Sequence, residues 1–147
     1  MAALPTSRFA PALAELARPA DLRALSLPVL HVVMAMRLAA LFDRAGRDPL
    51  VEMTTRLASI TAAEQLLALV RLVARSWPEP YMAGRPCCLH MTPDERTLAG
   101  MVRAAVKADR AGFGRQIDGF VRADRHEPLF QQTVLAVASL AQPQDRA

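Results

Sequence analysis

Apolar residues recur at intervals of three and four positions over most of the chain, the spacing that places side chains on one face of an α-helix. Residues 29–42 are apolar almost throughout, and Met53 and Leu57 continue the pattern after a short break. Four further stripes follow: Leu66, Val70, Val73 and Trp77; Leu98, Met101, Val102 and Ala105; Phe113, Ile117, Phe120 and Val121; and Phe130, Val134, Val137 and Ala141. No segment alternates between apolar and polar residues as a strand does. The pattern predicts an all-α fold, a compact single-domain bundle of about six to eight helices.

Start signals for these helices stand in the polar gaps between the stripes. Residues 61–64 (Thr-Ala-Ala-Glu) and 92–95 (Thr-Pro-Asp-Glu) both have Thr followed three positions later by Glu. In such a capping box each of the two side chains accepts a hydrogen bond from a backbone N–H at the helix start. Pro28 and the pair Asp48-Pro49 predict two earlier starts, because proline fits the first turn of a helix.

The helical pattern predicts one main domain with two flanking segments. The expected parts are an N-terminal arm, residues 1–27, with short helical pieces at 8–17 and 20–26; the bundle, residues 28–141; and a frayed tail, residues 142–147. The stretch from Trp77 to Met91 is rich in Pro and Gly. We expect it to be a structured connection within the domain, because neither half of the chain alone offers enough apolar surface for a core.

Composition narrows the class of protein. Apolar residues make up 52% of the 147 residues and charged residues 22%, and the formal net charge is +4. As a helix, the apolar run 29–42 would rise about 21 Å, less than the roughly 30 Å of a bilayer core, so we expect a buried helix and no contact with a membrane. No signal peptide is visible, and the only two cysteines are adjacent, which disfavours a disulfide between them. These features predict a soluble, cytoplasmic protein with reduced thiols.

Cys87, Cys88 and His90 place three potential zinc ligands within four positions, just before a predicted helix start. A structural zinc site needs a fourth ligand, from another histidine or a carboxylate. The candidates are His31, His126 and Asp94. Two other interpretations stay open. The thiols could be packed in an apolar pocket, as free cysteines often are, or could act in redox chemistry next to a helix N-terminus.

A second candidate site is a basic surface in the last third of the chain. Arg103, Lys107 and Arg110 are spaced for one face of a helix, and Arg115 and Arg122 follow in the next predicted helix. Arginine and lysine clustered on one face are typical of proteins that contact nucleic-acid phosphates. These five residues therefore define a possible nucleic-acid-binding surface.

Residues 93–123 have the outline of a helix–turn–helix unit with its turn at 111–112. A second helix that reads DNA exposes polar side chains such as Asn, Gln, Ser and Thr. The predicted second helix offers Gln116, but it also contains Gly114 and Gly119, which loosen a helix. A solvated basic face is therefore the alternative to a nucleic-acid-binding regulator.

No catalytic motif is legible in the sequence. Asp94 and Glu95 are explained by the helix start, and the other acidic residues are scattered. His31 fits a core histidine. Helices that are apolar on more than one side, such as residues 29–42, have to be covered within the domain or by a partner. We therefore interpret the chain as a protein–protein interaction or regulatory module without catalytic activity or cofactor, which binds a protein partner or forms a homodimer.

The segment Cys87-Cys88-Leu89-His90-Met91-Thr92-Pro93-Asp94-Glu95 resembles an uncharacterised family of short all-helical proteins from alphaproteobacteria. That family shows a cysteine cluster, then Met-Thr and an acidic residue that opens a helix. Arg-Asp-Pro-Leu at 47–50 is similar as well, and the resemblance covers residues 28–141. The chain departs from the family where Leu89 and His90 replace a third cysteine followed by proline, which puts a shared metal site in doubt. The resemblance implies fold class and compartment, and no activity.

Overall fold

The computed structural model describes residues 21–142, and its regular elements are helices. In chain order they are the short 3-10 helix η1 (Leu22–Ala24) and the α-helices α2 (Leu27–Arg44), α3 (Leu50–Leu57), α4 (Ile60–Ser76), α5 (Pro93–Val106), α6 (Arg110–Ile117) and α7 (Ala123–Leu140). Within residues 21–142 no β-sheet forms, and one isolated bridge pairs Asp21 with His90. The predicted all-α bundle is confirmed. The helical piece predicted at 8–17 and residues 143–147 of the predicted tail lie outside the described residues.

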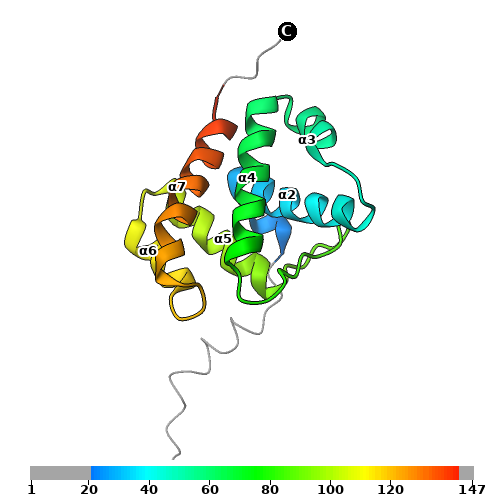
Figure 1. The fold of residues 1–147 in the computed structure, drawn as a ribbon. Coiled ribbons are helices and arrows are strands. Elements are labelled where there is room, and N and C mark those ends of the chain that lie inside the picture. Colours follow the sequence, from blue (N-terminus) through cyan, green and yellow to red (C-terminus); the bar gives the residue numbers. More distant parts are fainter. Residues whose placement is uncertain (1–20, 143–147) are drawn as a thin grey trace, which may run out of the picture.

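The helices are arranged around α4 and α5 (Figure 1). α4 lies beside α7, and α5 lies behind them in this view and contacts α2, α6 and α7. α3 packs against α4 at one edge of the bundle, and α6 packs against α5 at the opposite edge. Two different parts of the surface are therefore formed by a short outer helix on a long inner one.

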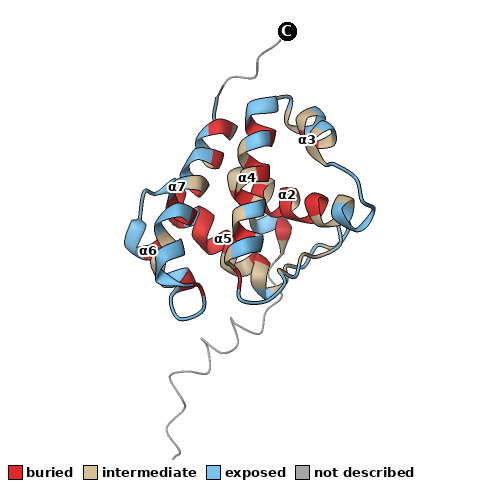
Figure 2. Cartoon of the chain, viewed as in Figure 1, coloured by how far each residue is buried: buried red, intermediate tan, exposed pale blue. Residues whose placement is uncertain are grey.

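The core lies where α2, α4, α5 and α7 face one another, as the buried stretches in Figure 2 show. Residues 35–39 of α2 are all buried, so this helix is covered on every side along its middle turn. One of these residues is Arg37, a charged side chain. By contrast, the outer helix α3 buries Met53 alone. No helix in the described part of the chain has both the length and the apolar character needed to cross a membrane.

The capping box predicted at residues 92–95 is confirmed. Oγ1 of Thr92 accepts a hydrogen bond from the N–H of Glu95 at 3.2 Å, and Oε2 of Glu95 accepts one from the N–H of Thr92 at 3.3 Å. The start predicted at Asp48-Pro49 lies one residue later: α3 begins at Leu50 after Pro49, and Oδ1 of Asp48 accepts a hydrogen bond from the N–H of Leu50 at 3.0 Å. These short polar side chains satisfy backbone donors that a helix leaves free at its first turn.

The capping box predicted at residues 61–64 is wrong. α4 begins at Ile60, two residues before the expected start, and the capping residue is Ser59. Its backbone is extended, and its Oγ accepts a hydrogen bond from the N–H of Ala62 at 3.1 Å. The preceding Ala58 takes a left-handed φ of 52°, which ends α3 abruptly and leaves Ser59 in the capping position.

The stripe predicted from Phe113 to Val121 is shorter than expected. α6 ends at Ile117, and Gly119 takes a φ of 87°, which turns the chain. Phe120 therefore lies in the connection to α7, where its ring meets that of Trp77 edge-on with the centroids 5.4 Å apart.

The stripe predicted on the last helix is correct in part: Phe130 is buried and Val137 packs half-buried against the core, but the other two positions do not belong to the buried face. The buried face of α7 consists of Leu129, Phe130, Thr133, Ala136 and Ser139. Val134 is 36% exposed, and Ala141 lies beyond the last helical residue. The error arose because Thr133 is polar: its hydroxyl donates to the carbonyl of Leu129 at 2.7 Å, which lets it be buried.

Candidate functional site

A buried arginine in the middle of α2 binds the connection between α4 and α5. All five N–H groups of Arg37 donate hydrogen bonds. Two go to the carboxylate of Glu95, at 2.9 and 2.8 Å, and three go to the backbone carbonyl oxygens of Arg85, Cys88 and His90. A guanidinium has five N–H donors, so its capacity is completely used. The bonds to Glu95 raise the pKa of Arg37, which keeps the side chain charged.

Glu95 completes this arrangement from the first turn of α5. Its Oε1 accepts from Nε of Arg37 and from the N–H of Gly84, and its Oε2 accepts from Nη2 of Arg37 and from the N–H of Thr92. One carboxylate thus serves the capping box and a fully buried ion pair. Because buried charges are tolerated only when paired and hydrogen-bonded, the Arg37–Glu95 pair fixes α2, α5 and the connection relative to one another.

The approach of the connection to Arg37 requires a glycine at position 84. A Cβ on Gly84 would lie 2.7 Å from Nη2 and 3.0 Å from Cζ of Arg37, closer than van der Waals contact allows. The connection is also tied to α5 by Asp94, whose carboxylate accepts from Nε1 of Trp77 at 3.2 Å and from the N–H of Met82 at 2.8 Å. These contacts hold the connection before Gly84, and the bonds from Arg37 to three backbone carbonyls hold it after Gly84.

The two cysteines lie on the outside of this arrangement. Cys87 is exposed and Cys88 is half-buried, and both are free thiols. The N–H of Cys88 donates to the carbonyl of Arg85 at 3.0 Å, which closes a turn with Pro86 and Cys87 at its centre. Sγ of Cys88 lies 3.6 Å from the backbone oxygen of His90. Arg37 therefore binds the backbone of this segment. The contact between Cys88 and His90 joins the thiol to the backbone oxygen of His90 and does not involve the imidazole ring.

Within residues 21–142, no group of three or more His, Cys, Asp or Glu side chains is placed to hold a metal ion. The candidates for a fourth zinc ligand have other surroundings. Nε2 of His126 is hydrogen-bonded to the carbonyl of Val121 at 2.9 Å, Asp94 binds the connection, and His31 lines a cavity beside α2. Zinc binding by residues 87–90 stays a prediction, for which the described part of the chain supplies no further ligand.

The basic face predicted for one helix is divided between two. α5 ends at Val106, and the chain turns at residues 107–109 rather than at 111–112. Asp109 starts α6 by accepting a hydrogen bond from the N–H of Gly112 at 2.9 Å. Arg110 is therefore the first residue of α6, and the prediction of a continuous helix face through it is wrong.

Three of the five predicted basic residues nevertheless meet where α5 contacts α6. Arg103, Lys107 and Arg115 line one concavity of about 220 Å³. The remaining two are engaged in ion pairs elsewhere, Arg110 with Glu127 and Arg122 with Asp124. The basic surface is thus more compact than predicted.

An apolar cavity of about 300 Å³ lies between α2, α3 and α4. Its lining consists of Met34, Ala35, Leu38, Leu41, Met53, Leu57 and Leu66, with Pro86 from the connection and His31 and Arg56 as the polar members. Leu41 is 46% exposed, so the apolar lining continues onto the surface. A volume of this size is at the lower end of the range for binding cavities, roughly 300–1,000 Å³.

The polar members of the apolar cavity lie on different helices. Burial lowers the pKa of His31 on α2, so its imidazole is neutral at pH 7. Arg56 on α3 forms an ion pair with Glu52 at 2.8 Å, one turn earlier on the same helix, and its side chain is 61% exposed. The cavity therefore has an apolar floor and a charged edge.

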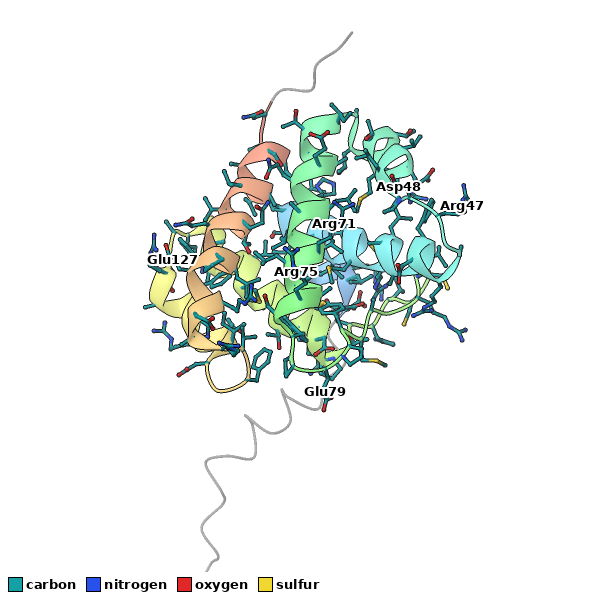
Figure 3. All side chains as sticks on the ribbon, viewed as in Figure 1. Arg47, Asp48, Arg71, Arg75, Glu79 and Glu127 are labelled. Carbon is teal, nitrogen blue, oxygen red and sulfur yellow. The ribbon has the colours of Figure 1, made fainter. Side chains whose placement is uncertain are left out.

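A second hollow, of about 540 Å³, lies on another face of α2, against α4. Charges of both signs line it: Arg47 and Asp48 on the connection between α2 and α3, and Arg71 on α4 (Figure 3). Cations and carboxylates on one rim favour no single class of ligand. The apolar cavity, with its uniform floor, is therefore the stronger candidate.

Sequence reasoning missed both the Arg37–Glu95 pair and the apolar cavity. A signal for the pair was present, because Arg37 is a lone cation in the middle of the apolar run 29–42 and a buried charge requires a partner. The cavity has no local signal, since it depends on how three helices cross. The resemblance to alphaproteobacterial proteins stays a prediction, because comparison with protein-family models, with curated proteins and with solved structures gives no match.

Proposed function

We propose that this chain is a binding module rather than an enzyme, and that it takes the apolar side chains of a partner protein's amphipathic helix into the apolar cavity. The observation that carries the proposal is the cavity itself: an aliphatic floor between three helices, open through Leu41 and edged by the ion pair of Arg56 with Glu52. An apolar centre inside a polar rim is the usual anatomy of a protein interface.

The lining favours a helix over a rigid small molecule. Met34 and Met53 both contribute to it, and methionine side chains adapt to differently shaped apolar partners. The volume, at the lower end of the range for ligand sites, accommodates a few side chains, and a helix presents such anchors at positions i, i+3 or i+4 from one face. The edge carries both charges of the Arg56–Glu52 pair, which suits polar residues beside those anchors.

The Arg37–Glu95 pair supports this role by holding one wall of the cavity. Pro86 lines the cavity and stands next to Arg85, whose carbonyl accepts a hydrogen bond from Arg37. A wall fixed before binding lowers the conformational entropy that association costs. On this proposal the unusual segment around Cys87 shapes the binding surface rather than performing chemistry.

The test is site-specific crosslinking followed by a binding measurement. A photo-reactive phenylalanine analogue replaces Leu41 in one variant and Leu135, which is 53% exposed on α7, in the control. The captured protein segment is then synthesised as a peptide, and its affinity is measured for the wild type, for Leu41→Glu and for Leu135→Glu. We expect an amphipathic helical segment to be captured at position 41 alone. Leu41→Glu should weaken its binding at least about tenfold and Leu135→Glu should not change it.

Three outcomes would contradict the proposal. They are capture of the same segment at position 135, capture of a second copy of this chain at position 41, and equal affinity of both variants for the peptide. A small apolar molecule that co-purifies with the protein and protects position 41 from crosslinking would also exclude a helix as the occupant.

A further inference from the structure

A polar concavity of about 220 Å³ lies where α5 meets α6, at the edge of the bundle away from α3. We call it the anion concavity. It is lined by Gly100, Arg103, Ala104, Lys107, Asp109, Gly112, Arg115 and Gln116. It shares no residue with the apolar cavity, so the two sites can be tested independently.

The cations of the anion concavity are available to a ligand. In the part of the chain that the structure describes, Arg103 and Lys107 form no ion pair. Arg115 forms a long ion pair with Asp109, 3.9 Å between Nη2 and Oδ2, and its side chain is 72% exposed. Arg110, which stands at the start of the same helix, is by contrast paired with Glu127.

The charge balance of the anion concavity is positive. Its single carboxylate, Asp109, opposes three cations, which leaves two net positive charges, and its Oδ1 is occupied by the N–H of Gly112. The negative end of the α5 dipole accounts for a cation at Lys107, the C-terminal cap of that helix. It does not account for Arg115, which reaches the same concavity from α6.

Two glycines line the anion concavity at points of close approach. A Cβ on Gly100 would overlap the side-chain amide of Gln116, and a Cβ on Gly112 would overlap the carboxylate of Asp109. Both glycines have ordinary negative φ angles, so their role is close approach and not backbone strain. Gly100 lets Gln116 of α6 approach α5 closely, and Gly112 leaves room for the side chain of Asp109 at the start of α6.

We propose that the anion concavity binds the phosphoryl group of a small phosphorylated molecule. Its volume is below that of sites for whole ligands, about 300 Å³, so it fits an anionic group whose remainder extends into solvent. Two guanidinium groups and an ammonium offer donors that match phosphoryl oxygens. An extended nucleic-acid track is not favoured, because Arg110 and Arg122 are engaged in ion pairs.

Glycine amides provide the readout. Of the six glycines, Gly100 in α5 and Gly112 in α6 line the anion concavity. Gly46 lies between α2 and α3 and Gly84 between α4 and α5, away from the concavity. In protein labelled with ¹⁵N-glycine, we expect inorganic pyrophosphate at low salt to shift the signals of Gly100 and Gly112 saturably and to leave the other two unchanged. Shifts at Gly100 and Gly112 that do not saturate, or that equal those at Gly46 and Gly84, would overturn the proposal.

Two variants with the same change in net charge make the test specific. The double variant Arg103→Gln and Arg115→Gln should weaken pyrophosphate binding at least about tenfold. The control, Arg71→Gln with Arg75→Gln, removes two exposed cations of α4 (Figure 3) and should leave the affinity unchanged. Equal weakening by both variants would mean that only net charge attracts the anion.

Titration with a single-stranded oligonucleotide distinguishes a nucleic-acid backbone from a small phosphorylated molecule as the source of the phosphoryl group. If it binds with a logarithmic salt slope of several units, at roughly 0.7 per phosphate contacted, an extended nucleic-acid surface replaces the proposed single-phosphoryl site. A slope near one unit, together with loss of oligonucleotide binding in the double variant, would agree with the proposal.

Discussion

Replacing Glu95 by Gln tests what the Arg37–Glu95 pair does for the fold. The substitution keeps the size of the side chain and removes its charge. One amide oxygen can still accept hydrogen bonds, but the amide NH₂ cannot accept from Arg37 or from the N–H of Thr92. Both partners have no exposed surface in the wild type, so the cation left on Arg37 could reach water only if the connection opened.

The expected loss follows from this burial. Removing one member of a buried, hydrogen-bonded ion pair costs about 3–5 kcal/mol, which is a large part of the roughly 5–15 kcal/mol by which a domain is stable. Urea unfolding followed by circular dichroism measures it, provided that the urea dependence stays the same. Glu127→Gln is the control, because Glu127 pairs with Arg110 on the exposed surface, where such a pair contributes about 0–1 kcal/mol.

A double variant separates the free energy of the Arg37–Glu95 ion pair itself from that of the hydrogen bonds between Arg37 and the connection. Where the two members of a buried ion pair bond only to each other, replacing both by apolar residues is about neutral or stabilising. In Arg37→Leu with Glu95→Leu, the carbonyls of Arg85, Cys88 and His90 would also lose their donor, at about 1–3 kcal/mol for each group left buried. We therefore expect this variant to remain several kcal/mol less stable than the wild type. Wild-type stability in the double variant, or a loss below about 1 kcal/mol in Glu95→Gln, would refute the reasoning.

Three further substitutions test other parts of the account. Gly84→Ala should destabilise the protein by about 1–3 kcal/mol in urea unfolding, because its Cβ would press on Arg37, whereas Gly114→Ala, whose Cβ would meet only His126 at 4.0 Å, should stabilise α6 by about 0.5–1 kcal/mol. Ser59→Ala should cost about 0.5–2 kcal/mol and Thr61→Ala much less; the reverse order would restore the capping box at residues 61–64. His31 has a lowered pKa when folded, so the unfolded chain binds more protons below pH 6.5 and stability should fall as the solution is acidified through that range. His31→Gln should remove this part of the pH dependence, and an unchanged profile in that variant would contradict the assignment.

The sequence predicted the helices well because their signals are local. The stripe from Leu98 to Ala105 and the start at Thr92 need only neighbouring residues to be read, and both are as expected. Two errors occurred where a backbone turn or a side-chain hydrogen bond within a helix changed the role that the residue type alone suggests. Ser59 displaced Thr61 as a cap because α3 ends in a left-handed residue, and Thr133 is buried because its hydroxyl finds a carbonyl within the helix.

The candidate sites were less accessible to sequence reasoning because they depend on residues far apart in the chain. Arg37 and Glu95 are 58 positions apart, and only the packing of α2 on α5 brings them together. Spacing also placed Arg103, Lys107 and Arg110 on one helix, although the chain turns between the last two. The apolar cavity depends on three helices whose individual faces look like ordinary core. Patterns along the chain therefore predict elements, while the sites arise from contacts between them.

The most direct test of the proposed binding role is a titration of methionine methyl groups. Protein labelled with ¹³C at the methionine methyls is titrated with the helical peptide captured at position 41. We expect the signals of Met34 and Met53, which line the apolar cavity, to shift until saturation. Met101, buried in α5, and Met82, exposed on the connection, should stay unchanged. Binding that leaves Met34 and Met53 unchanged would show that the peptide docks elsewhere and would contradict the assignment of the apolar cavity.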